Sequence, residues 1–155
     1  MKKNSNDKTI FATNTSALSI NEISKFIKNN TKIVGLHYFS PVNKMPLIEI
    51  VKLKNTPDEV ISKCIDFSIS QNKTFIVVKD GPGFYVNRIL APYLNEAMIM
   101  IEEGESIRKI DESMVNFGFP IGPFTLMDEV GIDVCAKVMS GNLVEMFRKR
   151  SGFYM

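Results

Sequence analysis

The sequence predicts an α/β segment over residues 1 to about 80, followed by an all-helical segment over the rest of the chain. Up to Val78, short apolar runs rich in β-formers alternate with helix-start signals, a pattern typical of strands and helices packed in layers. After the break at Asp80-Gly81-Pro82-Gly83, apolar residues recur at intervals of three and four, which is the helical period. We therefore expect two domains, residues 1–80 and residues 81–155.

Four apolar runs in the first segment predict strands. Each run is short, rich in β-branched or aromatic residues and followed by turn residues, as strands usually are. The runs are residues 9–13, 32–39, 47–53 and 74–78. Because helix signals lie between them, strands and helices are expected to pack into one layered domain.

Two capping boxes predict the helices of the first segment. Ser19 is followed three residues later by Glu22, so that each can bond the other's backbone at a helix start. The face that follows carries Ile23, Phe26 and Ile27. Thr56 and Glu59 form the second box, with Pro57 at the first helical position, and this helix should reach about residue 70.

The second segment contains two helical stripes and further helical turns. A long helix is expected over residues 86–103, and its stripe is Leu90, Leu94, Ala97 and Ile101. This stripe is either domain core or a dimerisation seam. A second stripe, residues 107–117, ends at Gly118, which suits a left-handed helix end. Residues 124–139 hold one or two more helical turns around Gly131.

The composition excludes several classes of protein. With 155 residues, 45% hydrophobic and 23% charged, the chain resembles a folded domain, and its net charge of +2 without a basic stripe does not indicate nucleic-acid binding. No apolar run approaches the roughly 20 residues of a membrane span, and residues 1–8 lack a signal peptide's apolar region. Cys64 and Cys135 fit a reduced cytoplasm, and with one histidine they make no metal-ligand set.

His37 and Glu49 are the strongest candidates for chemistry. His37, the only histidine, ends an apolar strand and is either a hydrogen-bonded structural residue or a catalyst. Glu49 lies in the next apolar strand, where a buried carboxylate is costly unless it is paired. Two strands joined by the intervening proline-containing turn can be antiparallel neighbours, which would place Glu49 beside His37. A carboxylate on one imidazole nitrogen fixes the tautomer, as a general base requires.

Two further polar residues lie where a predicted strand ends or a predicted helix begins. Ser16 comes just after the first strand, at the edge where open parallel sheets bind ligands, and is either a turn residue or a substrate contact. Asn87 opens the long helix and is either a helix-start polar residue or an amide that donates to a developing oxyanion. Both stay open as candidates for ligand binding.

The order and spacing of several motifs add a resemblance. The motifs are Phe11-Ala12-Thr13-Asn14-Thr15-Ser16, Gly35-Leu36-His37-Tyr38-Phe39-Ser40-Pro41-Val42, Glu49, Lys79-Asp80-Gly81-Pro82-Gly83-Phe84-Tyr85-Val86-Asn87-Arg88, and Gly122-Pro123-Phe124 with Asp128 and Gly131. Together, from about residue 10 to residue 133, they resemble the L-3-hydroxyacyl-CoA dehydrogenase family, including the dehydrogenase part of bacterial fatty-acid oxidation proteins. Each motif alone is weak, but the combination is highly specific.

The resemblance implies a role for each candidate. His37 would take the proton of the substrate 3-hydroxyl while hydride leaves C3 for NAD, and Glu49 would orient the imidazole. Ser16 would contact the substrate hydroxyl, and Asn87 would lie near the substrate oxygens and the nicotinamide. The implied reaction is the oxidation of a 3-hydroxyacyl-CoA to a 3-ketoacyl-CoA in fatty-acid β-oxidation, in the cytoplasm.

The chain departs from the family pattern in two places. It contains no Gly-x-Gly-x-x-Gly turn to hold the pyrophosphate of NAD, so residues 1–80 are expected to be the C-terminal part of a Rossmann-like NAD-binding domain. Residues 81–155 would be the family's helical C-terminal domain, which serves dimerisation and substrate binding; it is either abbreviated or has lost sequence before its close in Ser151-Gly152-Phe153-Tyr154.

A partner is expected because the strand around Phe11 would be a sheet edge. The partner would be a second copy or a chain that supplies the rest of the NAD-binding domain. The alternative to an enzyme is a catalytically incomplete fragment that acts as an acyl-CoA-binding or assembly module.

Overall fold

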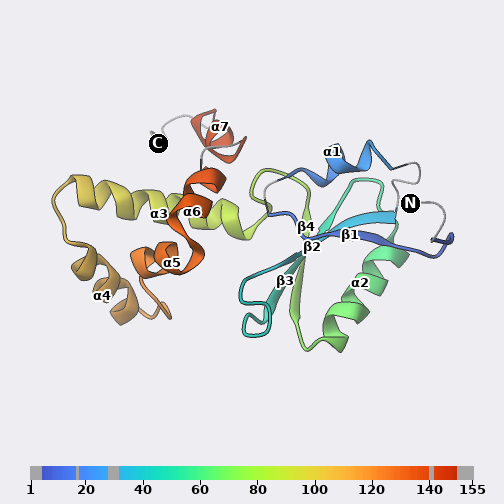
Figure 1. The fold of residues 1–155 in the computed structure, drawn as a ribbon, viewed down its shortest axis with the longest axis horizontal. Helices are drawn as coiled ribbons and strands as arrows, with labels where there is room; N and C mark the ends of the chain where they lie inside the picture. Colours follow the sequence, from blue (N-terminus) through green and yellow to red (C-terminus); the bar gives the residue numbers. More distant parts are fainter. Residues whose placement is uncertain (1–4, 17, 28–31, 140–141, 150–155) are drawn as a thin grey trace. The chain divides into compact units, whose positions relative to one another are not determined.

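The computed structural model describes residues 5–16, 18–27, 32–139 and 142–149, so residues 151–154 lie outside the described part (Figure 1). The chain divides into two compact units, Met1–Tyr85 and Val86–Met155, which we call the sheet unit and the helical unit. Among the described residues, no helix has both the length and the apolar character needed to cross a bilayer.

The described part of the sheet unit forms a four-stranded sheet in the order β1-β2-β3-β4. The strands are β1 (Phe11–Thr13), β2 (Ile33–Tyr38), β3 (Leu47–Lys52) and β4 (Thr74–Lys79). β1 pairs parallel with β2, β2 antiparallel with β3, and β3 parallel with β4. All four expected strands are confirmed, and β1 lies at an edge of the described sheet.

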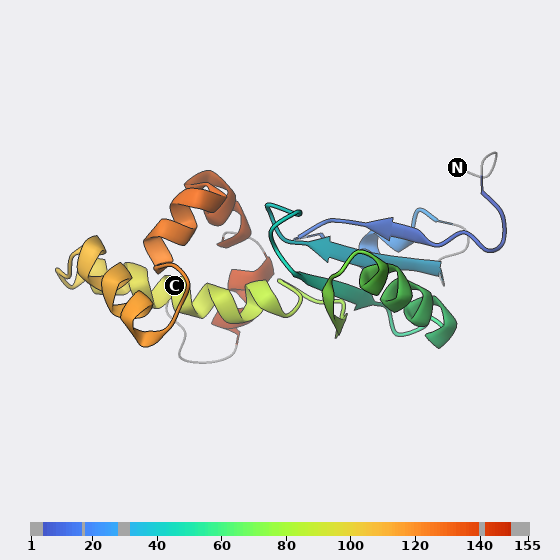
Figure 2. The ribbon, with the colours of Figure 1, turned by 90° about the horizontal axis from the view of Figure 1, so that it is seen from below.

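Two helices, α1 (Ile20–Ser24) and α2 (Asp58–Ser70), cover opposite faces of this sheet (Figures 1 and 2). Alternate residues of β2 and β3 point to opposite faces, and because a helix covers each face, both strands are mostly apolar, with His37, Glu49 and Lys52 as the polar exceptions. The face under α2 buries Val34, Leu36, Ile48 and Ile50 with Val60, Ile61 and Cys64. The face under α1 buries Ile20, Ile33, Val51, Leu53 and Phe84.

Gly35 lets α1 approach the sheet closely. A Cβ at this position would lie 2.9 Å from the Cβ of Val51 and 3.1 Å from the Cδ1 of Ile20. Both neighbours are fully buried, so neither has room to move. The missing side chain in β2 therefore allows Ile20 to pack directly on the strand that carries His37.

The two capping predictions differ in outcome. Ser19 is the N-cap of α1 and accepts a hydrogen bond from the N–H of Glu22. The second capping box is wrong: Pro57 occupies the N-cap of α2, and the hydroxyl of Thr56 instead accepts the N–H of Leu53 at 2.9 Å. A threonine before a helix can bond upstream as well as downstream, and here its hydroxyl accepts from the strand end.

The expected apolar face of α1 is also partly wrong. α1 ends at Ser24, two residues before Phe26, which is 91% exposed. Ile23 and Ile27 do pack against the core. Because α1 ends at Ser24, helical spacing no longer places Phe26 on the buried face with Ile23 and Ile27.

The helical unit contains both expected helices, but the second stripe is only partly buried: Ile110 is buried, whereas Ile107 and Phe117 are 54% and 80% exposed. Its helices are α3 (Val86–Glu102), α4 (Ile107–Phe117), α5 (Pro123–Val130), α6 (Ile132–Met139) and α7 (Asn142–Arg148). Gly118 ends α4 with φ 122°, as expected for a left-handed helix end. Ala91 of α3 packs with Leu143 and Phe147 of α7.

Asp111 of α4 holds the start of α5. Its Oδ1 accepts the N–H of Phe124 at 2.9 Å, and its Oδ2 accepts the N–H and the hydroxyl of Thr125 at 2.9 and 2.7 Å. A Cβ at Gly122 would lie 2.2 Å from the Cγ of this aspartate. Glycine at residue 122 therefore leaves the space that the carboxylate needs.

Candidate active site

The centre of the candidate site is a pair of directly opposed residues on β2 and β3. The antiparallel register places His37 opposite Glu49, as expected from the sequence. Opposed residues project to the same face of a sheet, and the Nδ1 of His37 lies 2.6 Å from the Oε2 of Glu49. His37 is 5% exposed and Glu49 0% exposed. The pair is thus shielded from solvent, where a charge-assisted hydrogen bond is strongest.

The contact determines which imidazole nitrogen is free to accept a proton. An ionised carboxylate has no proton to donate, so the Nδ1 of His37 is the donor in the 2.6 Å contact. The Nε2 of the neutral ring then carries the lone pair. When Nε2 takes a proton, the resulting imidazolium lies against the negative charge of Glu49, which compensates it. This is the geometry of a general base with an orienting carboxylate.

The second oxygen of Glu49 is also engaged. Its Oε1 accepts the backbone N–H of Tyr85 at 2.9 Å, from the segment that follows β4. A fully buried carboxylate is tolerated only when such donors offset its lost hydration. The two oxygens of Glu49 therefore face two different donors, one from the imidazole and one from the backbone.

Two aromatic rings flank the imidazole of His37. The ring of Phe39 is tilted, with its centroid 4.6 Å from that of the imidazole, and the ring of Phe84 meets it edge-on at 5.7 Å. Phe84 is 5% exposed, so this side of the pair is apolar. An apolar wall keeps water from competing for the hydrogen bond between His37 and Glu49.

Ser16 and Asn87 differ in what the structure says of them. β1 and β2 run parallel, so their C-terminal ends lie at the same end of the sheet. Ser16, three residues beyond the end of β1, therefore lies at the end of the sheet where β2 carries His37. The side chain of Asn14 joins these strand ends, because its Oδ1 accepts the N–H of Tyr38 at 2.8 Å. Asn87 lies in the first turn of α3 in the helical unit, and its place at the site stays a prediction.

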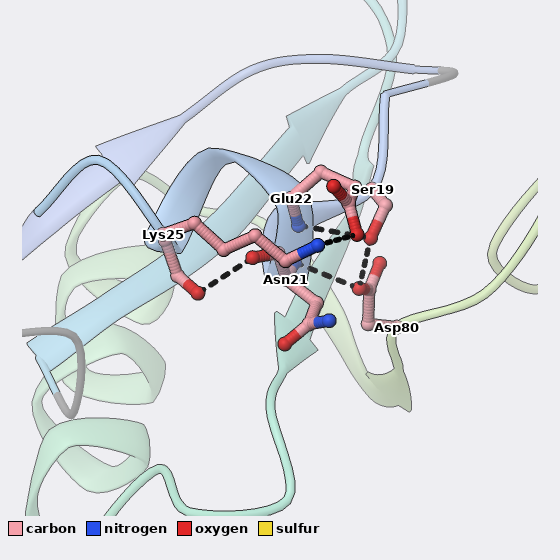
Figure 3. Close-up of polar contacts among 6 residues, drawn as sticks. Ser19, Asn21, Glu22, Lys25 and Asp80 are labelled. Atoms are coloured by element: carbon pink, nitrogen blue, oxygen red, sulfur yellow. Dashed lines mark hydrogen bonds and ion pairs between the residues drawn. The ribbon is translucent and has the colours of Figure 1, made fainter.

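A second polar cluster anchors α1 to the end of β4. The Oδ2 of Asp80 accepts the hydroxyl of Ser19 at 2.7 Å and the N–H of Asn21 at 2.9 Å (Figure 3). Its Oδ1 accepts the N–H of Ile20 at 3.1 Å. With Ser19 accepting the N–H of Glu22, three amides at the start of α1 have acceptors, as a helix start requires.

Asp80, Phe84, Tyr85 and Asn14 occur in the sequence motifs, but no contact of theirs was predicted. Asp80 could have been found from two features together: it is a carboxylate directly after a predicted strand, and the helix that begins after Ser19 has backbone N–H groups that need acceptors. No sequence signal marks the contribution of Tyr85, because it uses a backbone amide that every residue but proline has. Among the described residues, no three His, Cys, Asp or Glu side chains come together as a metal site would require.

Comparison with known proteins agrees with this layout. Residues 1–81 match the family model described as 3-hydroxyacyl-CoA dehydrogenase, NAD binding domain, and residues 83–154 match the one described as 3-hydroxyacyl-CoA dehydrogenase, C-terminal domain. The two family models describe consecutive parts of one class of dehydrogenase, its NAD-binding domain and its C-terminal domain. The chain belongs to the 3-hydroxyacyl-CoA dehydrogenase family.

Among its relatives are two proteins named fatty acid oxidation complex subunit alpha. That of Idiomarina loihiensis is 55% identical over 138 residues, which are 89% of this chain and 20% of the relative. That of Vibrio vulnificus is 49% identical over 152 residues, 98% of this chain and 22% of the relative. The chain therefore spans about a fifth of the length of these relatives.

Two solved structures also match. (S)-3-hydroxybutyryl-CoA dehydrogenase PaaH1 of Ralstonia eutropha is 38% identical with a TM-score of 0.81, over 86% of this chain and 48% of that one. FadB2 of M. tuberculosis is 31% identical with a TM-score of 0.87, over 93% of this chain and 51% of that one. Both units of the chain therefore have the fold expected from the sequence.

Proposed function

We propose that this chain carries the proton-transfer site of a 3-hydroxyacyl-CoA dehydrogenase, which oxidises 3-hydroxyacyl-CoA to 3-ketoacyl-CoA in fatty-acid β-oxidation. The observation that supports it is the buried 2.6 Å contact between His37 Nδ1 and Glu49 Oε2. In this reaction the 3-hydroxyl loses its proton as the C3 carbonyl forms. The Nε2 of His37 is the acceptor of that proton, and Glu49 stabilises the imidazolium that results.

Two further residues are assigned by the family resemblance. Ser16 would donate a hydrogen bond to the substrate oxygen at C3 and hold it toward the base. Asn87 would contact the substrate oxygens from the start of α3, where an amide N–H can stabilise charge that develops on an oxygen. Neither role follows from a contact in the sheet unit, so both stay predictions.

NAD, when bound, accepts the hydride that leaves C3. The residues of this chain fit the substrate side of that chemistry, because the base and its orienting carboxylate are paired and buried. They include no Gly-x-Gly-x-x-Gly turn for the pyrophosphate. We propose that a chain carrying that turn, or a second copy of this chain, contributes to the active assembly.

An acyl-CoA is the proposed substrate, and the cytoplasm the proposed location. The free thiols of Cys64 and Cys135 fit a reducing compartment. The alternative, a binding or assembly module without turnover, is not favoured, because burying an imidazole against a fully buried carboxylate has a desolvation cost that such a module has no need to bear.

The test is NADH-linked reduction of acetoacetyl-CoA by the purified chain, alone and with a separately produced polypeptide that carries the family's Gly-x-Gly-x-x-Gly strand and helix. We expect turnover in the mixture and its loss on His37→Ala. Glu59→Gln, at an exposed carboxylate of α2, is the matched surface control and should keep the rate. Absence of turnover with both polypeptides folded would refute the proposal.

A further inference from the structure

The turn at residues 83–85 contacts both members of the imidazole–carboxylate pair. The ring of Phe84 meets the imidazole of His37 edge-on at 5.7 Å, and the N–H of Tyr85 donates to the Oε1 of Glu49 at 2.9 Å. One short segment thus contacts the ring through an apolar side chain and the carboxylate through a backbone amide.

The backbone of this turn is left-handed at Phe84, a residue with a side chain. Gly83 has φ 69° and Phe84 has φ 46°, both left-handed, and the N–H of Phe84 donates to the carbonyl of Gly81 at 3.0 Å. A left-handed φ is unfavourable for phenylalanine, because its Cβ crowds the backbone, so the surrounding contacts must hold it. The turn buries the ring of Phe84 and at the same time brings the next amide to Glu49.

We infer that the turn at residues 83–85 fixes the orientation of the Glu49 carboxylate, through which the proton of His37 is held on Nδ1. The N–H of Tyr85 engages Oε1 of Glu49, which leaves Oε2 to face Nδ1, while Phe84 restricts the tilt of the ring. The proton is thereby held on Nδ1, and Nε2 is kept as the acceptor. Phe84 and the amide of Tyr85 are positioning groups, and the catalytic meaning of this inference rests on the proposed function.

Glu49→Gln separates the turn from the carboxylate's charge. Glutamine has one acceptor oxygen and one NH₂ group, so it cannot accept from both Tyr85 and His37. The backbone N–H of Tyr85 can only donate, so it needs the glutamine oxygen as its acceptor. If the turn is fixed, the glutamine carbonyl faces Tyr85 and its NH₂ faces Nδ1, which forces the proton of His37 onto Nε2.

The experiment is nitrogen NMR of the full chain with labelled histidine. His37 is the only histidine, so every imidazole signal belongs to it. We expect the proton on Nδ1 in the parent chain and on Nε2 in Glu49→Gln. Glu22→Gln, at a carboxylate whose side chain is 62% exposed, is the matched control and should leave the tautomer on Nδ1. A proton that stays on Nδ1 in Glu49→Gln would overturn the inference.

Phe84→Leu tests the ring contact. With the edge-on ring gone, the minor tautomer should rise by about tenfold, the usual effect of weakening one hydrogen bond. Phe75→Leu removes a ring from the opposite core face and is the matched control. Equal tautomer populations in Phe84→Leu and Phe75→Leu would remove Phe84 from the mechanism.

A measurement on the parent chain covers the case in which a variant does not fold. The amide proton of Tyr85 should exchange with solvent at least about tenfold more slowly than an unbonded amide, because it donates to a buried carboxylate. An unprotected amide would refute the inference by itself. These readings need neither substrate nor NAD, so they can succeed where the turnover experiment fails, and the two proposals are tested separately.

Discussion

The sheet unit and the helical unit each use an aspartate to hold a helix of which it is not part, but only the sheet unit has a carboxylate aimed at an imidazole. Asp80 accepts amides at the start of α1, and Asp111 accepts amides at the start of α5. Glu49 accepts one amide and one imidazole proton, and it is fully buried. The three carboxylates therefore differ in their partners and in their burial, and Glu49 is the one whose contact the proposed proton transfer requires.

The largest expected effect comes from breaking the pair. His37→Ala should lower turnover in the complemented assay by roughly 10²–10⁴-fold, because in the reduction the oxygen at C3 loses the imidazolium that would give it a proton, the reverse of the transfer in the oxidation. The measurement is the initial rate with acetoacetyl-CoA. If His37→Ala kept more than a tenth of the rate, the imidazole would be structural, and the distinction between Glu49 and the two aspartates would fail.

Gly122→Ala should destabilise the helical unit. The new Cβ would lie within 2.2 Å of the Cγ of Asp111, so the carboxylate must leave the start of α5, at a cost of about 1–3 kcal/mol. Urea unfolding followed by circular dichroism measures the loss. Gly81→Ala is the matched control, since a Cβ there meets nothing within 4 Å. Equal midpoints for the two variants would show that Asp111 does not depend on this space.

Asp80→Asn should weaken the anchoring of α1. Asparagine keeps one acceptor but places an NH₂ group against donors, and losing helix-start acceptors costs about 0.5–2 kcal/mol. The imidazole signal of His37 reports unfolding of the sheet unit during urea titration. Asp66→Asn, at an exposed aspartate of α2, is the control and should not shift the midpoint. A shift of equal size in both variants would contradict a special role for Asp80.

The pairing of His37 with Glu49 could be predicted because it depends on two short-range regularities. Strand periodicity fixes which residues share a face, and a short connection favours antiparallel neighbours. The second capping box failed because the hydroxyl of Thr56 had two donors within reach, and sequence does not say which one it takes. The turn at residues 83–85 could not be predicted, since its contribution comes from a left-handed phenylalanine and a backbone amide, neither of which has a sequence signature.

Asp111 differs from an exposed aspartate in its pKa. Desolvation by burial acts to raise the pKa of its carboxyl, but hydrogen bonds from the hydroxyl of Thr125 and the amides of Phe124 and Thr125 outweigh it, and the net direction is downward from 3.8. A lowered pKa in the folded state means that the unfolded chain binds more protons near this pH, so stability rises with pH there.

The smallest expected effect is therefore a pH dependence confined to the acid range. The contribution of Asp111 to stability should be fully present above its unfolded pKa of 3.8 and should be lost as pH falls through the lower folded pKa. Urea midpoints of the parent chain and of Asp111→Asn, measured between pH 6 and about pH 2 in steps that bracket the unfolded value, test this. The difference between the urea midpoints of the parent chain and of Asp111→Asn should shrink as pH falls. Protonation removes the carboxylate charge from the parent chain, and the substitution has already removed it from the variant. A difference that stays constant across the range would show that the charge of Asp111 does not stabilise the start of α5.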